Sequence, residues 1–303
     1  MNKLLIICGL TATGKTALAV SLSKKFKGEL ISADSRQVYQ GLDIGTGKDH
    51  PETVKIHLVD VVKPDQEFSV SKYYRLVWQV IKKIWKKDKL PILVGGTGFY
   101  IKAVIDSLAT KDIPPNPRIR EGMKDWSPKK LYQYLEELDP IKVASLNQSD
   151  RQNPRRLIRA IEIVAWKKEN PDWQPKKHQK PSVLFIGLKT DYKKLYKRID
   201  RRVRERVKEG AEKEVKDLID QDYSWDLPAM NAMGYLQWKP FFEGKVNRET
   251  VIERWQMAEH AFARRQMTWF KKDKRINWFD INQKGWENKV EDLVEKWYSK
   301  NDA

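Results

Sequence analysis

The chain has 303 residues, 40% of them hydrophobic, so it is long enough and apolar enough to fold around a substantial core. Its net charge of +18 and its pI near 9.7 predict attraction to a polyanion, most often a nucleic acid. No apolar run approaches the roughly 18 residues that a membrane span needs, so no membrane partner is expected. The single cysteine, Cys8, excludes an internal disulfide and fits a cytoplasmic location. One cysteine with four histidines also argues against a structural zinc site.

The excess of positive charge is clustered. Residues 1–50 carry seven basic and four acidic side chains, whereas residues 189–208 carry ten basic and three acidic ones. Residues 264–275 carry six basic side chains and one acidic. This distribution favours a binding surface for nucleic acid over a lysine-rich surface that serves only solubility, which remains the alternative.

The first third of the chain alternates between strand and helix patterns. The apolar run 3–8 predicts a buried strand, and leucines at spacing four predict a helix over 15–25. Further strands are predicted at 29–33, 56–61 and 90–94, with a helix over 70–87. Strands that alternate with helices imply right-handed crossovers and a parallel sheet.

Beyond this region the pattern changes. Residues 112–118 hold three prolines and predict a linker, and helices without a strand are expected up to about residue 181. One helix is well marked: Asn153 can cap it, Pro154 suits its first turn, and Leu157, Ile161 and Val164 form its apolar stripe. Residues 182–188 predict a strand that returns to the sheet. Helices should follow, including a long one over 192–219.

Residues 9–16 read GLTATGKT and match the phosphate loop, G-x-x-x-x-G-K-[ST]. A strand precedes the motif and a helix follows it, so successive backbone N–H groups and the helix N-terminus can surround a phosphate, whereas a chance match would lack this context. The predicted phosphate-binding residues are Gly9, Thr11, Ala12, Thr13, Gly14, Lys15 and Thr16. The predicted fold is therefore α/β, with a P-loop NTPase-like parallel sheet flanked by helices. Residues 1–111 and 182–303 form its core, and residues 112–181 form a helical insertion.

The motif alone does not identify the reaction, because nucleotide hydrolysis, kinase chemistry and displacement of diphosphate all use such a loop. Asp60, at the end of the strand predicted at 56–61, is a candidate Walker-B acid or a residue that caps the next turn. Asp34 follows the second strand and lies at the edge where parallel sheets bind ligands. It can coordinate Mg²⁺, bind a sugar hydroxyl, act as a general base or cap a helix. Thr97, in GGTGFY, offers a hydroxyl after another strand.

Eight motifs span nearly the whole chain: GLTATGKT, ISADSRQVYQGLDIGTGK, HLVDVVKPDQEFSV, PILVGGTGFYIKAV, NPRRLIRAIEI, RIDRRVRERVKEGAEKEV, AMGYLQ and RRQMTWFKKD. In this order they resemble the tRNA dimethylallyltransferase family, also called tRNA isopentenyltransferase. Each motif after the first is weak alone, but the common order of all eight makes coincidence implausible.

The resemblance implies a defined reaction. The family transfers a dimethylallyl group from dimethylallyl diphosphate to N6 of the adenosine at position 37 of tRNA, beside the anticodon, and Mg²⁺ assists the release of diphosphate. In this sequence Asp34 matches the general base, Thr97 and Arg202 match further catalytic residues, and Thr16 matches the Mg²⁺ ligand. The phosphate loop then holds diphosphate and not ATP. Because the lone pair of the adenine amine is delocalised, removal of its proton helps, typically by about 10²–10⁴ in rate.

The resemblance also implies contacts with the anticodon stem-loop of tRNA. The matching residues are Asp34, Ser35, Arg36, Gln37, Thr97, Arg118, Arg155, Arg156, Leu157, Ile158, Arg159, Arg264, Arg265 and Gln266. Helical spacing places Arg155, Arg156 and Arg159 on one face, which can meet a phosphate backbone or remain a solvated basic face. We expect a monomer.

Two other functions stay open on the residues alone. A small-molecule phosphotransferase, such as a nucleotide kinase, would share the phosphate loop but would not explain the clustered basic segments. A non-catalytic RNA-binding protein would not explain the intact Lys15, Thr16 and Asp34.

Overall fold

The computed structural model describes residues 2–48, 51, 54–107, 110–174 and 181–300. The chain divides into two compact units, which are described separately: unit 1 comprises residues 1–106 and 180–303, and unit 2 comprises residues 107–179. Among the described residues, no helix combines the length and the apolar composition that crossing a bilayer requires.

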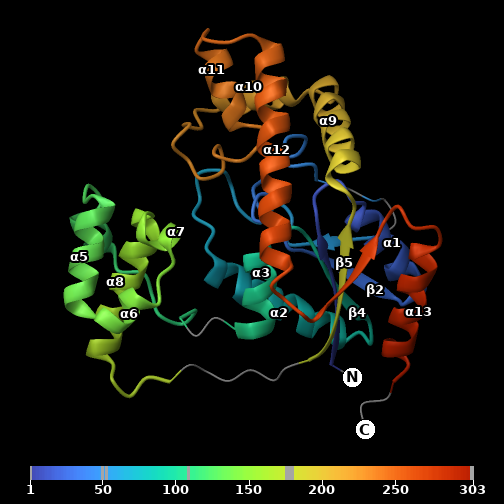
Figure 1. Cartoon of the computed structure of the whole chain (residues 1–303), viewed down its shortest axis with the longest axis horizontal. Helices are drawn as coiled ribbons and strands as arrows, with labels where there is room; N and C mark the ends of the chain where they lie inside the picture. Colours follow the sequence, from blue (N-terminus) through green and yellow to red (C-terminus); the bar gives the residue numbers. More distant parts are fainter. Residues whose placement is uncertain (1, 49–50, 52–53, 108–109, 175–180, 301–303) are drawn as a thin grey trace. The chain divides into compact units, whose positions relative to one another are not determined.

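Unit 1 is built on a six-stranded sheet with the order β3-β2-β4-β1-β5-β6, in which every neighbouring pair is parallel (Figure 1). Its strands are β1 (Lys3–Gly9), β2 (Gly28–Ser32), β3 (Ile56–His57), β4 (Leu90–Val94), β5 (Ser182–Lys189) and β6 (Ile276–Asp280). β1 lies between β4 and β5, so the loop that follows β1 leaves the sheet near its middle. The predicted α/β class with a parallel sheet is confirmed.

The two faces of the sheet pack against different helices, as the alternating side chains of β1 show. Leu4 and Ile6 pack in one cluster with residues of α2 and α3, whereas Leu5 and Ile7 pack in another with residues of α1 and α13. The helices of unit 1 are α1 (Lys15–Lys25), α2 (Val70–Trp85), α3 (Gly98–Lys102), the π-helix η1 (Ala103–Ser107), α9 (Tyr192–Glu209), α10 (Ala211–Asp220), the 3₁₀-helix η2 (Leu236–Trp238), α11 (Lys239–Phe242), α12 (Arg248–Phe270) and α13 (Trp286–Tyr298).

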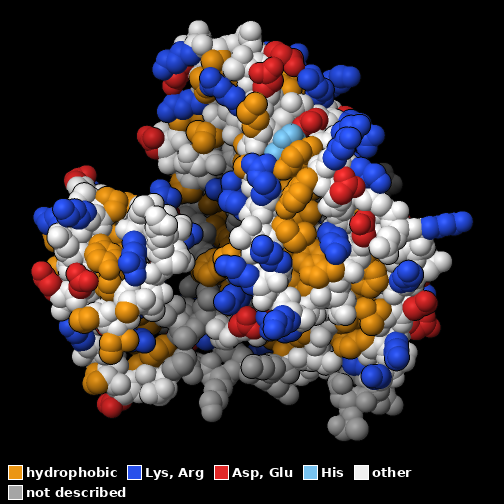
Figure 2. Space-filling model, in the orientation of Figure 1, with side chains coloured by type: hydrophobic (Ala, Val, Ile, Leu, Met, Phe, Trp, Pro, Cys, Tyr) orange, Lys and Arg blue, Asp and Glu red, His pale blue; other side chains and the backbone are white. Residues whose placement is uncertain are grey.

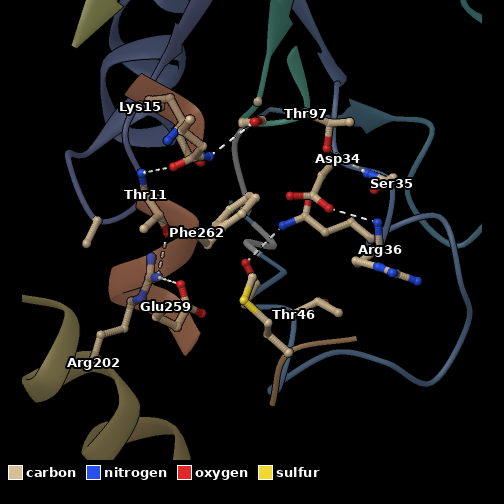
Figure 3. Close-up of a pocket in the computed structure, with 18 of the residues that line it drawn as sticks. Thr11, Lys15, Asp34, Ser35, Arg36, Thr46, Thr97, Arg202, Glu259 and Phe262 are labelled. Carbon is tan, nitrogen blue, oxygen red and sulfur yellow. Dashed lines mark hydrogen bonds and ion pairs between the residues drawn. The ribbon is translucent and has the colours of Figure 1, made fainter. Parts of the chain in front are cut away.

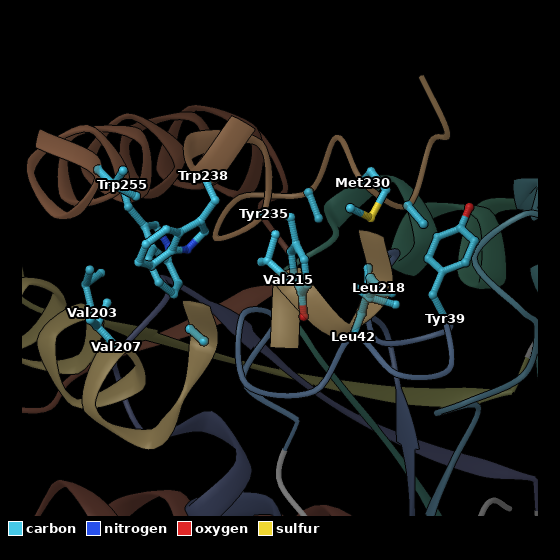
Figure 4. Close-up of a cluster of buried hydrophobic side chains, with 14 of the residues drawn as sticks. Tyr39, Leu42, Val203, Val207, Val215, Leu218, Met230, Tyr235, Trp238 and Trp255 are labelled. Carbon is cyan, nitrogen blue, oxygen red and sulfur yellow. The ribbon is translucent and has the colours of Figure 1, made fainter. Parts of the chain in front are cut away.

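A third apolar cluster joins α9, α10 and α12 to the chain after β2 (Figure 4). Tyr235, Trp238 and Trp255 are fully buried in it, together with Val203 and Val207 of α9. These large aromatic side chains are therefore structural. They fix α9 and α12, which carry many of the basic residues, against the loops that follow the sheet.

Three details of unit 1 differ from the sequence prediction. The strand predicted over 56–61 is only two residues long, because the backbone turns at Leu58 and Asp60, which both have positive φ. The long helix predicted over 192–219 is two helices, since Gly210 adopts a φ of 108° and ends α9. Strand β6 lies in a region that was predicted to be entirely helical, and it pairs with the edge of β5.

Unit 2 is helical, and no strand occurs in residues 110–174. Its helices are α4 (Pro117–Gly122), α5 (Pro128–Leu138), α6 (Pro140–Ala144), α7 (Gln148–Arg151) and α8 (Pro154–Glu169). Asn153 accepts a hydrogen bond from the backbone N–H of Arg156 at 3.2 Å, as predicted for the cap of α8. Leu157 and Ile161 of α8 pack against Leu131 of α5 in a separate small core.

Candidate active site

A pocket of about 780 Å³ opens at the carboxyl ends of β1, β2 and β4 (Figure 3). Its walls are the phosphate loop after β1, the segment Asp34–Gln37 after β2 and the segment Gly95–Phe99 after β4. α9 and α12 supply the remaining sides. The structure thus brings together three segments that are far apart in the sequence, at the edge of the sheet where the sequence predicted a site.

Two side chains of the phosphate loop form hydrogen bonds with the backbone of the same loop. The Thr13 hydroxyl and the Lys15 ammonium both donate to the carbonyl oxygen of Leu10, at 2.7 and 2.6 Å. Thr13 is 2% exposed and, like Gly9, does not line the pocket, whereas Thr11, Ala12, Gly14, Lys15 and Thr16 do. Burial, and after it the positive charge of Arg202, lowers the pKa of Lys15 to about 8. An anion in the pocket would relieve this crowding of positive charge.

Arg202 reaches the loop from α9. Its Nη2 donates to the Thr11 hydroxyl at 2.7 Å and to Glu259 at 3.2 Å, while its Nε is buried without a partner among the described residues. Arg202 also lines the pocket, so its guanidinium can face a bound anion. Arg202, predicted as a catalytic residue, thus contacts the phosphate loop directly.

Asp34 and Thr97 lie on adjacent strand ends in the same pocket. Oδ1 of Asp34 accepts the backbone N–H of Arg36 at 2.8 Å, and the Thr97 hydroxyl oxygen accepts the backbone N–H of Ser35 at 3.1 Å. These two bonds fix the orientation of the carboxylate and of the hydroxyl without using the second carboxylate oxygen or the hydroxyl proton. Both groups remain able to act on a ligand.

Two residues predicted to contact tRNA have side-chain amides that bind the protein itself. Gln266 is 4% exposed; its Oε1 accepts the backbone N–H of Thr11 at 2.7 Å, and its Nε2 donates to the carbonyl of Gly96 at 3.1 Å. Gln37 accepts from Ser32 and donates to the carbonyl of Gly47 at 3.0 Å. Both line the pocket, and their amides hold its walls together; the tRNA contacts of these two residues stay a prediction.

Asp60 is not a Walker-B residue in this structure. It does not line the pocket, and it pairs with the ammonium of Lys48, whose side chain is fully buried. Lys48 also pairs with Asp43 at 2.5 Å and donates to the carbonyl of Tyr39 at 2.7 Å. Lys48 thus connects separate parts of the chain around β3, and Asp60 has a structural role as one of its partners.

Unit 2 carries the predicted basic helix, and its arginines are not equivalent. Arg155 is exposed, and Arg156 is exposed but pairs with Asp150 at 2.7 Å. Arg159 pairs with the buried Glu162 at 2.9 Å and donates to the carbonyls of three residues near the start of the unit, Thr110, Ile113 and Pro114. Arg159 therefore stabilises unit 2 through these bonds, and its contact with tRNA stays a prediction.

The remaining predicted RNA contacts in unit 2 divide in the same way. Leu157 is fully buried in the core, so its side chain cannot touch RNA, and Ile158 packs partly against the same core. Arg118 is exposed at the start of α4. Arg118, Arg155 and Arg156 are the fully exposed members of the predicted set in this unit.

Basic side chains also gather on unit 1. Figure 2 shows Lys and Arg side chains along α9 and α12, with apolar side chains between them. Arg264 is exposed and donates to the Tyr196 hydroxyl at 2.7 Å, whereas Arg265 lines the pocket beside Phe262. This surface adjoins the pocket, as expected for a site that receives part of a large polyanion.

Several pocket residues were not anticipated from the sequence. They are Thr46, Arg206, Met233, Glu259 and Phe262. Glu259 and Phe262 precede Gln266 by seven and four residues on α12, so helical spacing from the recognised RRQ motif would have placed them on the same face. Thr46 and Met233 belong to irregular segments, for which spacing gives no such signal.

Comparison with known proteins agrees with this geometry. The model of the IPP transferase family matches residues 37–273. The tRNA dimethylallyltransferase of Carboxydothermus hydrogenoformans is 37% identical over 304 residues, which cover 97% of this chain and 96% of that protein. The tRNA dimethylallyltransferase of Anoxybacillus flavithermus is 36% identical over 286 residues, covering 92% of this chain and 91% of that protein.

Two solved structures resemble the chain over nearly its full length. The tRNA isopentenylpyrophosphate transferase of Bacillus halodurans superposes with a TM-score of 0.71 at 33% identity and covers 98% of both chains. A eukaryotic dimethylallyltransferase acting on tRNA gives a TM-score of 0.82 at 25% identity, covering 97% of this chain and 78% of that one. With a matching family model, curated relatives of 36–37% identity and this pocket, the chain belongs to the IPP transferase family.

Proposed function

We propose that this chain transfers the dimethylallyl group of dimethylallyl diphosphate to N6 of the adenosine at position 37 of tRNA, giving N6-dimethylallyladenosine and diphosphate. One observation carries the proposal: a single pocket holds a phosphate loop with two cationic side chains, Lys15 and Arg202, and a carboxylate, Asp34, on a neighbouring strand end. The cationic side chains suit a group that leaves as an anion. The carboxylate suits an amine that must lose a proton. The names of the relatives support the same reaction.

The bond changes follow from this arrangement. The C–O bond between the allyl carbon and the diphosphate breaks, and the C–N bond to adenine forms. Asp34 accepts the proton of the amine, held in place through its bond with the N–H of Arg36. Lys15, Arg202 and the backbone N–H groups of the phosphate loop stabilise the charge that gathers on the departing diphosphate. Thr97 lies beside Asp34, where its hydroxyl can orient the incoming base.

Apolar side chains in the pocket can exclude water from the reacting carbon. Phe262 and Met233 line the same cavity as the phosphate loop, and Phe99 and Trp269 pack edge to face at 6.4 Å beside it. Water that reached the reacting carbon would hydrolyse the allylic diphosphate, so exclusion of water by these apolar side chains is part of the mechanism. We infer that the five-carbon chain lies against Phe262.

The residues present fit a Mg²⁺ ion. The described residues hold no group of three or more His, Cys, Asp or Glu side chains that could form a closed metal site. Mg²⁺ is usually held by one or two protein oxygens together with phosphate oxygens and water, and the Thr16 hydroxyl in the pocket can supply such an oxygen. When bound beside diphosphate, Mg²⁺ neutralises charge on the leaving group.

The RNA would be held by basic side chains outside the reacting centre. Arg118, Arg155 and Arg156 of unit 2 and Arg264 and Arg265 of α12 are accessible to phosphate oxygens. The target adenine must leave the stack of the anticodon loop to reach Asp34, as base-modifying enzymes generally require. Since tRNA is the substrate, we place the reaction in the cytoplasm, and we propose that the enzyme works as a monomer.

The proposal is tested by mass analysis of nucleosides after incubation of the enzyme with unmodified tRNA and Mg²⁺. One arm contains dimethylallyl diphosphate and the other contains ATP. The expected result is an adenosine heavier by one five-carbon unit, and only in the first arm. Consumption of ATP without prenylated adenosine would instead support the phosphotransferase.

A further inference from the structure

Glu259 is a buried carboxylate on α12 for which the proposed reaction has no use. It is 5% exposed and lines the pocket. Its two oxygens contact different guanidinium groups of α9: Oε2 lies 3.2 Å from Nη2 of Arg202, and Oε1 lies 3.5 Å from Nη1 of Arg206. One side chain therefore connects two arginines one helical turn apart.

The two arginines also contact two different walls of the pocket. Arg202 donates to the Thr11 hydroxyl of the phosphate loop, and Arg206 donates to the carbonyl of Gly45 at 3.2 Å. Gly47 makes room for Arg206, because a Cβ built at this position would lie 1.7 Å from its Nη2. Through the two guanidinium groups, Glu259 thus joins the phosphate loop to the loop that contains Thr46. Figure 3 shows the contacts of Arg202 with Glu259 and with Thr11.

A carboxylate at this position has an electrostatic cost. It faces the space that a diphosphate would occupy, and like charges in a buried site repel one another. Leaving the buried Arg206 and the partly buried Arg202 without an acidic partner would be costly as well. A side chain that is hydrogen-bonded before the ligand arrives also keeps its geometry when the ligand binds. The arrangement favours anion binding only if the free energy gained by placing the arginines exceeds the free energy lost to repulsion by the carboxylate.

We propose that Glu259 is a positioning residue for diphosphate binding, which holds Arg202 and Arg206 in the geometry that grips the departing anion. The inference rests on the proposed function, because it takes the anion of this pocket to be diphosphate. It extends that function by assigning a role to a residue that touches neither the transferred group nor the RNA.

The direction in which Glu259→Gln changes the affinity for diphosphate distinguishes a positioning role from a purely electrostatic one. In Glu259→Gln the negative charge is lost, so Coulomb repulsion alone would make anion binding tighter. The amide has only one acceptor oxygen, however, and its NH₂ group cannot accept from a second arginine. Positioning therefore predicts weaker binding of inorganic diphosphate, by about tenfold, as expected for the loss of one charge-assisted hydrogen bond.

The experiment measures the affinity for inorganic diphosphate in the presence of Mg²⁺ by calorimetry, and KM and kcat for dimethylallyl diphosphate. Glu259→Gln is compared with Glu259→Asp, which keeps the charge but is one methylene shorter and cannot reach both arginines. Glu253→Gln, an exposed residue of the same helix, is the matched control. tRNA affinity and thermal stability are recorded for each variant.

Weaker diphosphate binding in both Glu259→Gln and Glu259→Asp, with a raised KM and tRNA affinity equal to that of the Glu253→Gln control, supports positioning. Tighter or unchanged binding in Glu259→Gln overturns it. If Glu259→Gln does not fold, Glu259→Asp is the deciding variant, and diphosphate affinity equal to wild type in that variant would then overturn the inference. A wild-type protein that does not bind diphosphate at all contradicts the proposed function itself.

Discussion

Substitution of Asp34 by asparagine tests the general base most directly. The backbone N–H of Arg36 holds Oδ1 at 2.8 Å, and an amide oxygen can accept the same bond, so the side chain should keep its orientation. Its NH₂ group then replaces the oxygen that would receive the proton. Loss of general-base assistance lowers rates by about 10²–10⁴, which is roughly 3–5 kcal/mol in the activation free energy.

The assay is a single-turnover measurement with enzyme in excess over tRNA, so that substrate binding and product release do not limit the rate. Asp65→Asn, at an exposed position outside the pocket, serves as the control for the loss of one negative charge. Diphosphate affinity should be almost unchanged in Asp34→Asn. A single-turnover rate within a few-fold of wild type would refute the assignment of Asp34 as the proton acceptor.

Three further predictions address binding and stability. Lys15→Ala should reduce diphosphate affinity by at least about tenfold and leave tRNA affinity nearly intact; equal losses of both would show that the roles are misassigned. Arg155→Ala should reduce by about 1 the slope of log tRNA affinity against log salt concentration, and an unchanged slope would place α8 away from the RNA. Arg159→Ala should instead lower the free energy of unfolding by about 1–3 kcal/mol, because its internal hydrogen bonds are lost. Burial raises the pKa of Glu29, but hydrogen bonds from His57 and two lysines outweigh it and lower the pKa to about 2. Glu29 thus contributes stability above about pH 4.5 that is lost as the pH falls towards 2, at most about 3 kcal/mol, and Glu29→Gln should flatten the acid limb of a urea-denaturation series.

The sequence predicted the local structure of the site well where a motif fixes the backbone. The phosphate loop needs its glycines and a strand before it, and α1 begins at Lys15 and ends at Lys25 as predicted. β4 also coincides with its prediction, because an apolar run of five residues is bounded by a turn on each side. The prediction made β3 too long and missed β6, two edge strands whose extent depends on a neighbouring strand.

The roles of single polar side chains were less predictable. Gln266, Gln37 and Arg159 occur in motifs associated with RNA binding, yet each forms at least one hydrogen bond with a backbone group of the protein. A sequence states which donors and acceptors a residue carries, but the partner depends on which segments the fold brings within about 3 Å. These partners lie at sequence separations of 10 to 255 residues.

The sequence by itself determined the parallel α/β class, the phosphate loop with Lys15 and Thr16, and the place of Asp34 at the ligand-binding edge, because these follow from local spacing and from the rule that ligands bind at the carboxyl edge of such sheets. The role of Asp34 as the base is implied by the family resemblance. Only the tertiary structure decided that Glu259 bridges two arginines and that Asp60 serves Lys48. Ion pairs of this kind depend on helices and loops that pack together from distant parts of the chain. Their chemistry is therefore set by packing, which no local pattern encodes.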